Sequence, residues 1–108
     1  AEEGAVKILE VNKDAVVICI IDASKMERGL YLALEVIEKD YPVVIALNMW
    51  DVAQDKKIEI DVKELEDILT VPVVPVIAIS GEGIRELSLR IKETSLVKIE
   101  KIIEKAGN

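Results

Sequence analysis

The sequence predicts an α/β protein in which a parallel sheet lies between two layers of helices. Three continuous apolar runs support this prediction, and they cover residues 15–21, 43–48 and about 73–79. An apolar run without alternation is typical of a strand that is buried on both faces, as in parallel sheets. An amphipathic helical pattern follows each run, and such units imply parallel strands joined by right-handed crossovers. The expected fold is therefore a Rossmann-like, three-layer sheet with helices on both faces.

The bulk composition fits one domain and argues against several functions. The chain has 108 residues, of which 51% are hydrophobic and 3% aromatic, which is enough for a packed core but not for an aromatic binding surface. The net charge of −7 argues against nucleic acid as a partner, and the absence of His removes the commonest metal ligand and general base. No run is long enough to span a membrane, and no signal peptide is visible.

Three smaller observations concern the origin and chemistry of the chain. The single cysteine, Cys19, lies inside the first apolar run, so we expect a buried structural thiol and no disulfide within the chain. The first residue is Ala1 rather than Met, which suggests a processed chain or a fragment. The abundance of Ile, Val, Glu and Lys suggests a thermophilic source.

The first half of the chain is expected to contain two helical segments around the first strand. Residues 1–13 carry apolar residues among charges and are expected to be the end of an amphipathic helix. After the strand at 15–21, Ser24 and Glu27 have the spacing of a capping box, which predicts a helix from there to about Lys39.

The second half of the chain repeats this strand–helix pattern. Asp61 is expected to cap a further helix. Pro75 interrupts the third apolar run, and since proline cannot donate a ladder hydrogen bond, that strand is expected at a sheet edge. We therefore divide a single domain, residues 1–108, into three βα units over 15–93 and a C-terminal helix or helical extension over 94–108.

A polar tetrapeptide, Asn-Met-Trp-Asp, begins at the last residue of the strand 43–48, which is where open α/β sheets place their ligands. A carboxylate at Asp51 could accept hydrogen bonds from both the ring N–H and the exocyclic amine of guanine. Adenine would present an acceptor there and leave the carboxylate unpaired. Asn48 could reach the base and tie neighbouring loops together, and Met49 could lie on the ring face. The alternative is that these residues only form a turn and cap a helix over 52–54.

Several segments resemble the FeoB ferrous-iron transporter GTPases in the same order and spacing. The similarity covers roughly residues 14–93, and the matching segments are 21–24, 27–28, 30–32, 47–51, 58–61, 73–75 and 81–84. In that family Met replaces the Lys that is usual in the Asn-Lys-x-Asp motif, as Met49 does here.

The resemblance implies that this chain is the C-terminal half of a Ras-like G domain with the P-loop NTPase fold. It further implies GTP and GDP binding, slow GTP hydrolysis coupled to ferrous iron uptake, and Mg²⁺ as a cofactor of the complete domain. The domain would be cytoplasmic and attached to the cell membrane through a membrane transporter domain.

By the same resemblance, the residues that contact the guanine nucleotide are Asn48, Met49, Asp51, Ile77 and Ala78. The backbone N–H of Ala78 would meet the guanine carbonyl oxygen. Ile77-Ala78 stands where family members often carry Ser-Ala, so a hydroxyl that usually braces this loop is missing here.

The sequence also departs from a complete G domain. It contains neither the Gly-x4-Gly-Lys-Ser/Thr phosphate loop nor an Asp-x-x-Gly motif, so we do not expect this chain alone to hydrolyse GTP. In the family, the strand 15–21 lies beside the strand that feeds the phosphate loop. We therefore expect an open edge at 15–21, filled by the missing N-terminal half of the G domain or by a second copy.

Two other functions remain open from the residues alone. Asp22, at the end of the first strand, could be the phosphoacceptor of a receiver-like signalling domain, although capping or loop bracing is the better explanation of its position. The chain could instead be a non-catalytic, Rossmann-like interaction module that uses its open strand edge.

Overall fold

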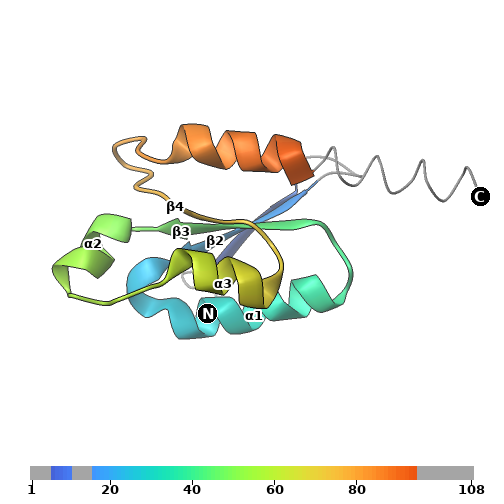
Figure 1. Ribbon diagram of the computed structural model, residues 1–108, viewed down its shortest axis with the longest axis horizontal. Helices are drawn as coiled ribbons and strands as arrows, with labels where there is room; N and C mark the ends of the chain where they lie inside the picture. Colours follow the sequence, from blue (N-terminus) through green and yellow to red (C-terminus); the bar gives the residue numbers. More distant parts are fainter. Residues whose placement is uncertain (1–5, 11–15, 95–108) are drawn as a thin grey trace, which may run out of the picture.

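A computed structural model describes residues 6–10 and 16–94, which form a four-stranded sheet with helices on both faces (Figure 1). The strands lie in the order β1-β2-β3-β4, and β2, β3 and β4 are parallel. A last helix covers residues 84–94. The other elements are β1 (Val6–Glu10), β2 (Val17–Asp22), the 3-10 turn η1 (Ala23–Lys25), α1 (Met26–Glu38), β3 (Val43–Asn48), α2 (Trp50–Asp55), α3 (Val62–Leu69) and β4 (Val73–Pro75).

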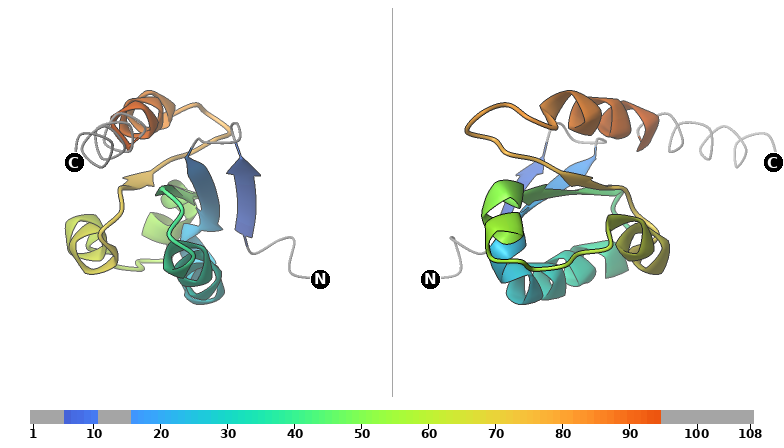
Figure 2. Two further views of the ribbon diagram at one scale, coloured as in Figure 1. Left: turned by 90° about the vertical axis from the view of Figure 1, so that its right-hand side faces the viewer. Right: turned by 60° about the vertical axis from the view of Figure 1, so that its left-hand side comes forward.

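Two apolar clusters fill the spaces on either side of the sheet. Alternate residues of β2 and β3, such as Cys19 and Ile45, are fully buried towards α1 and α3. The residues between them, such as Ile18 and Ala46, pack with Leu87 of the last helix on the opposite face. Figure 2 shows the last helix on one side of the sheet and α1 and α3 on the other. The predicted three-layer fold is confirmed.

The strand predictions agree with the structure except at the third run. The runs 15–21 and 43–48 became β2 and β3, whereas β4 ends at Pro75 instead of continuing to residue 79. The chain turns there because Ile77 pairs with Glu82 across a tight reversal. Pro75 does lie in an edge strand, as predicted, since β4 pairs with β3 alone in the sheet that the described residues form.

The N-terminal prediction was wrong. Within the expected helix end, 1–13, the described part is the strand β1, which pairs antiparallel with β2 from Val6↔Ile21 to Glu10↔Val17. The sequence Val-Lys-Ile in this segment also fits strand alternation, and an exposed strand edge is a strong template for pairing. The edge of 15–21 that we expected to be open is paired with β1 over residues 17–21.

Two helix starts differ in how they are capped. Asp61 caps α3 as predicted, its Oδ1 accepting a hydrogen bond from the Glu64 N–H at 3.1 Å. The predicted capping box at Ser24 is wrong, since α1 starts at Met26 after the turn η1 and its N-cap residue, Lys25, makes no capping bond with its side chain. Of the expected C-terminal extension, 94–108, only residue 94 is among those described.

Candidate functional site

The carboxyl ends of the parallel strands meet at one edge of the sheet. Asp22 is the register partner of Asn48, and Leu47 is the partner of Pro75, so β2, β3 and β4 end side by side. Figure 1 shows α2 and the turn after β4 at this same end of the molecule. The sequence-predicted site residues therefore gather where ligands of open α/β sheets bind.

Asn48 joins two segments that are 30 residues apart in the sequence. Its side-chain Oδ1 accepts a hydrogen bond from the backbone N–H of Ala78 at 3.0 Å. Two backbone hydrogen bonds join the same segments, from the Val76 N–H to the Leu47 oxygen at 2.8 Å and from the Trp50 N–H to the Val76 oxygen at 3.3 Å. We call these three hydrogen bonds, which connect residues 47–50 with residues 76–78, the Asn48–Ala78 seam. The expectation that Asn48 ties neighbouring loops together is confirmed.

Met49 makes the turn between β3 and α2. Its backbone is left-handed, with φ 58° and ψ 37°, a conformation that residues other than glycine adopt rarely. This single residue redirects the chain so that α2 begins at Trp50. The Met49 side chain is 41% exposed, so its apolar stem is accessible at the surface of the site.

Asp51 and Trp50 occupy the first turn of α2 but have opposite surroundings. The Asp51 side chain is exposed, and within the described part of the chain the structure gives its carboxylate neither a hydrogen bond nor an ion pair. Trp50 is half-buried and packs against the core cluster beneath α1 and α3. The carboxylate of Asp51 is therefore available to a ligand.

In the turn after β4, several backbone groups form hydrogen bonds within the turn itself. The Ile77 N–H donates to the Glu82 oxygen at 2.9 Å, and the Ile77 oxygen accepts from the N–H groups of Ser80 and Gly81. The Ala78 N–H, which we expected to meet a guanine oxygen, is already bonded to Asn48. In the free chain this donor is therefore engaged within the protein.

Ile79, which the sequence reasoning missed, lies at the tip of this turn. Its side chain is 98% exposed, and no hydrogen bond from its N–H is found among the described residues. The signal in the sequence was the neighbourhood of Gly81 and Gly83, both with φ 84°, which marks a tight reversal around this position. The Ile79 N–H is therefore a backbone donor available to a ligand, one residue after the Ala78 N–H that Asn48 binds.

Asp22 is occupied by local bonds. Its Oδ1 accepts from the Ser24 N–H at 2.9 Å and from the Ser24 hydroxyl at 2.6 Å, which caps the turn η1. The expectation that Asp22 braces the loop is confirmed, and the geometry does not favour a phosphoacceptor role.

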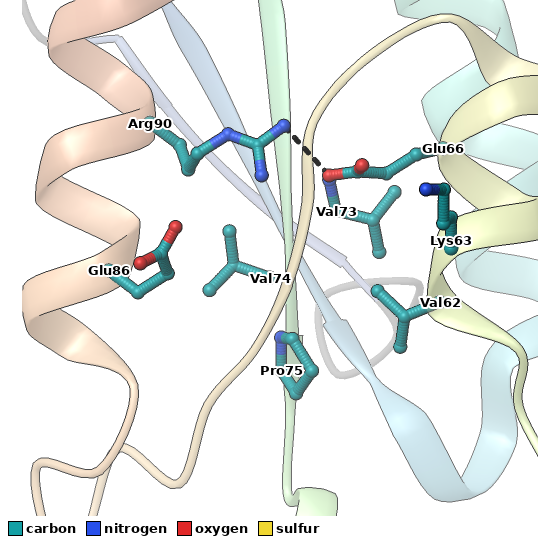
Figure 3. A pocket seen from close by; sticks show the side chains of 8 residues that line it. All are labelled: Val62, Lys63, Glu66, Val73, Val74, Pro75, Glu86 and Arg90. Carbon is teal, nitrogen blue, oxygen red and sulfur yellow. Dashed lines mark hydrogen bonds and ion pairs between the residues drawn. The ribbon is translucent and has the colours of Figure 1, made fainter.

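A groove of about 400 Å³ runs along the outer edge of β4, between α3 and the last helix (Figure 3). Glu66 and Arg90 form an ion pair across it, with Oε1 and Nη2 2.8 Å apart. The same Glu66 oxygen accepts from the Val73 N–H at 2.9 Å. Glu66 is thus bonded to both Arg90 and the strand edge, and neither Asn48 nor Ala78 lines the groove.

The described residues contain neither a cluster of three metal-ligating side chains nor a membrane-spanning helix. Across residues 6–10 and 16–94, no three side chains of the His, Cys, Asp and Glu types are placed to share a metal ion. Within the same part of the chain, no helix has both the length and the apolar character that crossing a bilayer requires.

Comparison with known proteins identifies the family. The family model of ferrous iron transport protein B matches residues 1–91. The Fe(2+) transporter FeoB of Salmonella typhimurium is 44% identical over 72 residues, which are 67% of this chain and 9% of the relative. FeoB of Escherichia coli strain K12 is 42% identical over the same share. The chain thus spans only 9% of the length of these relatives.

Solved structures agree with this result. The FeoB G-domain of Methanococcus jannaschii superposes with a TM-score of 0.72 and is 44% identical, covering 74% of this chain and 51% of that one. The cytosolic domain of the T. maritima FeoB iron transporter in its GMPPNP form gives a TM-score of 0.73 at 36% identity, covering 81% of this chain and 34% of that one. The chain therefore belongs to the ferrous iron transport protein B family and has the fold of its G domain, a P-loop NTPase fold.

Proposed function

We propose that this chain supplies the guanine-reading side of a GTPase domain that is coupled to ferrous iron transport. The observation that carries the proposal is the seam at the end of β3. The Oδ1 of Asn48 is bonded to Ala78, while the carboxylate three residues further on, at Asp51, has no protein partner among the described residues. A carboxylate with two free oxygens can accept hydrogen bonds from two adjacent donors on the edge of a base, and here it follows an amide that is held in place.

The free groups suggest a role for each residue. Asp51 would accept from the ring N–H and the exocyclic amine of guanine, two donors that adenine does not present together. Because Oδ1 of Asn48 is used by Ala78, its NH₂ group remains to donate to the acceptor N7 of guanine. Met49 would place its exposed stem against the ring face.

The turn after β4 would complete the base site. Ile77 and Ala78 shape this turn through their backbone bonds, so we propose them as its framework. The donor to the guanine carbonyl oxygen would then be the N–H of Ile79, in place of the Ala78 N–H that the sequence suggested. The exposure of Ile79 supports this assignment.

The wider role rests on the family. The T. maritima FeoB cytosolic domain was crystallised in GMPPNP and GDP forms, which supports GTP and GDP as ligands here. Phosphate and Mg²⁺ binding would come from parts of a G domain other than the residues described here, where no cluster of three metal-ligating side chains is found. We further propose that this domain works on the cytoplasmic side of the membrane, attached to a transporter that carries ferrous iron.

Substitution of Asp51 tests the proposal. Asp51→Asn replaces an acceptor oxygen by a donor NH₂, and we expect the affinity for GDP to fall about 10- to 100-fold, because hydrogen bonds to a charged group are lost. The same variant should gain affinity for xanthosine diphosphate, which carries a carbonyl oxygen in place of the exocyclic amine. Titration of a fluorescent GDP analogue, with energy transfer from Trp50, measures the first effect, and competition by unlabelled nucleotides measures the second.

Asp55→Asn is the matched control, since Asp55 is an exposed carboxylate at the other end of the same helix. It should bind GDP as the unmodified chain does, and ADP should compete weakly with every variant. Equal losses from Asp51→Asn and Asp55→Asn would contradict the proposal, and so would equal competition by ADP and GDP.

A further inference from the structure

The position of Asp51 is not fixed by its own side chain. Its carboxylate is exposed and has no bonded partner among residues 6–10 and 16–94. Selecting a base nevertheless requires that a carboxylate be held in place before the ligand arrives, because ordering it on binding would cost affinity. A neighbouring group must therefore supply the restraint.

Trp50 is the residue of this turn that is anchored in the core. Its side chain packs against a cluster of buried residues from β2, β3 and β4, whereas Asp51 on the next position faces solvent. An indole buries more apolar surface than any other side chain, so it can hold a short segment that has little stability of its own. Its backbone N–H also donates to the Val76 oxygen at 3.3 Å, but this is a long hydrogen bond.

The backbone around Trp50 needs such an anchor. Met49 is left-handed, and a non-glycine residue keeps this conformation only where its flanks are held. On one side Asn48 is bonded to Ala78. On the other side lies α2, which has only six residues and is too short to be stable alone. Two residues of α2 contact the core, Ala53, which is buried in it, and Trp50, which packs against it from the first turn. Trp50 is therefore the core contact that lies next to Asp51 on this second flank.

We propose that Trp50 is a positioning residue, which holds the Asp51 carboxylate where it meets the exocyclic amine of guanine. The inference rests on the proposed guanine-binding function for its effect on specificity. Its structural part, the anchoring of the first turn of α2, can be measured without any nucleotide.

The test of specificity compares GDP with inosine diphosphate, which lacks the exocyclic amine. For the unmodified chain we expect GDP to bind about 10-fold or more tightly than inosine diphosphate, as loss of a bond to a charged group implies. In Trp50→Ala the ratio of the two Kd values should fall below about threefold, and in Trp50→Phe, which keeps an aromatic anchor, most of the ratio should return. Isothermal titration calorimetry on the full 108-residue chain gives both Kd values.

Leu69→Ala is the matched control for a general loss of stability. Leu69 is a half-buried residue that packs against the same cluster, but it lies on a different helix, at the end of α3. It should leave the ratio of Kd values unchanged. A ratio that stays at the unmodified value in Trp50→Ala, or that falls equally in Leu69→Ala, would overturn the inference.

Hydrogen exchange gives the second measurement, on the free chain. The Ala53 N–H donates to the Met49 oxygen at 3.1 Å, which is the first helical bond of α2. This amide should exchange at least about 10-fold faster in Trp50→Ala than in Leu69→Ala, since local opening sets its protection. Unchanged protection would overturn the inference even if GDP binds. If the unmodified chain does not bind GDP, the proposed function and the role of Trp50 in specificity are both overturned. Faster exchange of the Ala53 amide in Trp50→Ala would then still show that Trp50 anchors the turn.

Discussion

The ends of β2 and β3 lie side by side, and an acidic side chain lies at the end of β2 and another three residues after the end of β3. The two carboxylates differ in their hydrogen bonding. Asp22, at the end of β2, accepts two hydrogen bonds from Ser24, both within a turn of three residues. Asp51, just beyond β3, is exposed and has no bonded partner among the described residues. Asn48, the register partner of Asp22, instead reaches across to Ala78.

The difference shows what distinguishes a candidate binding residue from a structural one. Both ends have a polar side chain after a buried strand, which is the pattern that attracts attention in a sequence. Only at the end of β3 does the structure leave a carboxylate free while fixing the loops around it. A carboxylate whose bonding capacity is filled by the turn it caps is better explained by that turn.

The largest effect is expected from the turn that brings Ala78 to the end of β3. A Cβ added at Gly83 would lie 2.3 Å from the Pro75 oxygen, and its φ of 84° is left-handed. Gly83→Ala should therefore lower the free energy of unfolding by about 3 kcal/mol or more, as backbone strain and a clash with main chain combine. Gly81, with the same φ and nothing within 4 Å, is the control, and Gly81→Ala should cost only about 1–2 kcal/mol. Urea unfolding measures both, and equal losses would show that the approach to Pro75 does not matter.

The interior of β2 offers a second contrast with its polar end. Burial raises the pKa of the Cys19 thiol from 9.0 to about 11. Because the folded state holds this proton more tightly, the stabilisation is complete below pH 9 and is lost as the pH rises from 9 to 11. The loss should be about 2–3 kcal/mol over that range, and Cys19→Ala should remove this slope whatever its effect at neutral pH. A stability–pH profile with the same slope in both chains would contradict this expectation.

Two single substitutions, one at each strand end, compare the end of β2 with the end of β3. Asn48→Ala and Asp22→Ala should each lower the free energy of unfolding by about 1 kcal/mol, since each removes hydrogen bonds that are partly exposed. The two substitutions should, however, change hydrogen exchange in different parts of the molecule. Exchange of the Ala78 amide should become faster in Asn48→Ala and stay unchanged in Asp22→Ala, because only Asn48 accepts from that N–H. Equal changes at Ala78 would mean that the two ends act as one unit.

The smallest effect is expected at Glu66, which extends the comparison to a third carboxylate. Like Asp22 it is used inside the structure, by Arg90 and by the Val73 N–H. Glu66→Gln keeps an oxygen for Val73 and weakens the ion pair only, so the cost should be below about 1 kcal/mol. Glu66→Ala should cost more, since it also leaves the Val73 N–H without this acceptor. Nucleotide binding should not change in either variant, and a loss of GDP affinity would show that the groove is part of the site.

The sequence was sufficient for most of the sheet and for part of the site. Apolar runs predicted β2 and β3, and the proline in the third run placed β4 at an edge, because these features follow from local burial and hydrogen bonding. The strand β1 could not be predicted, since five residues fit the end of a helix as well as an edge strand. What decides between them is the unpaired edge of β2, which is a tertiary feature.

The same limit applies to the site. The motif at the end of β3 identified Asn48, Met49 and Asp51 as candidates, but the use of the Ala78 N–H depends on a contact between residues 30 apart. The helix α2 appeared in the sequence only as an alternative over 52–54, because its six residues are too few for a stable helix alone and depend on the packing of Ala53 and Trp50 against the core. The exposure of Ile79 likewise depends on a turn that only the folded chain defines.

We propose that a guanine base binds at the end of β3 and not at the end of β2. The most direct measurement is a titration of the ¹⁵N-labelled chain with GDP and with ADP, followed by backbone amide resonances. With GDP we expect saturable shifts at Asn48, Asp51 and Ile79 and none at Ser24, and with ADP we expect weak shifts or none. Shifts centred on Ser24, or the same shifts with both nucleotides, would contradict the proposal.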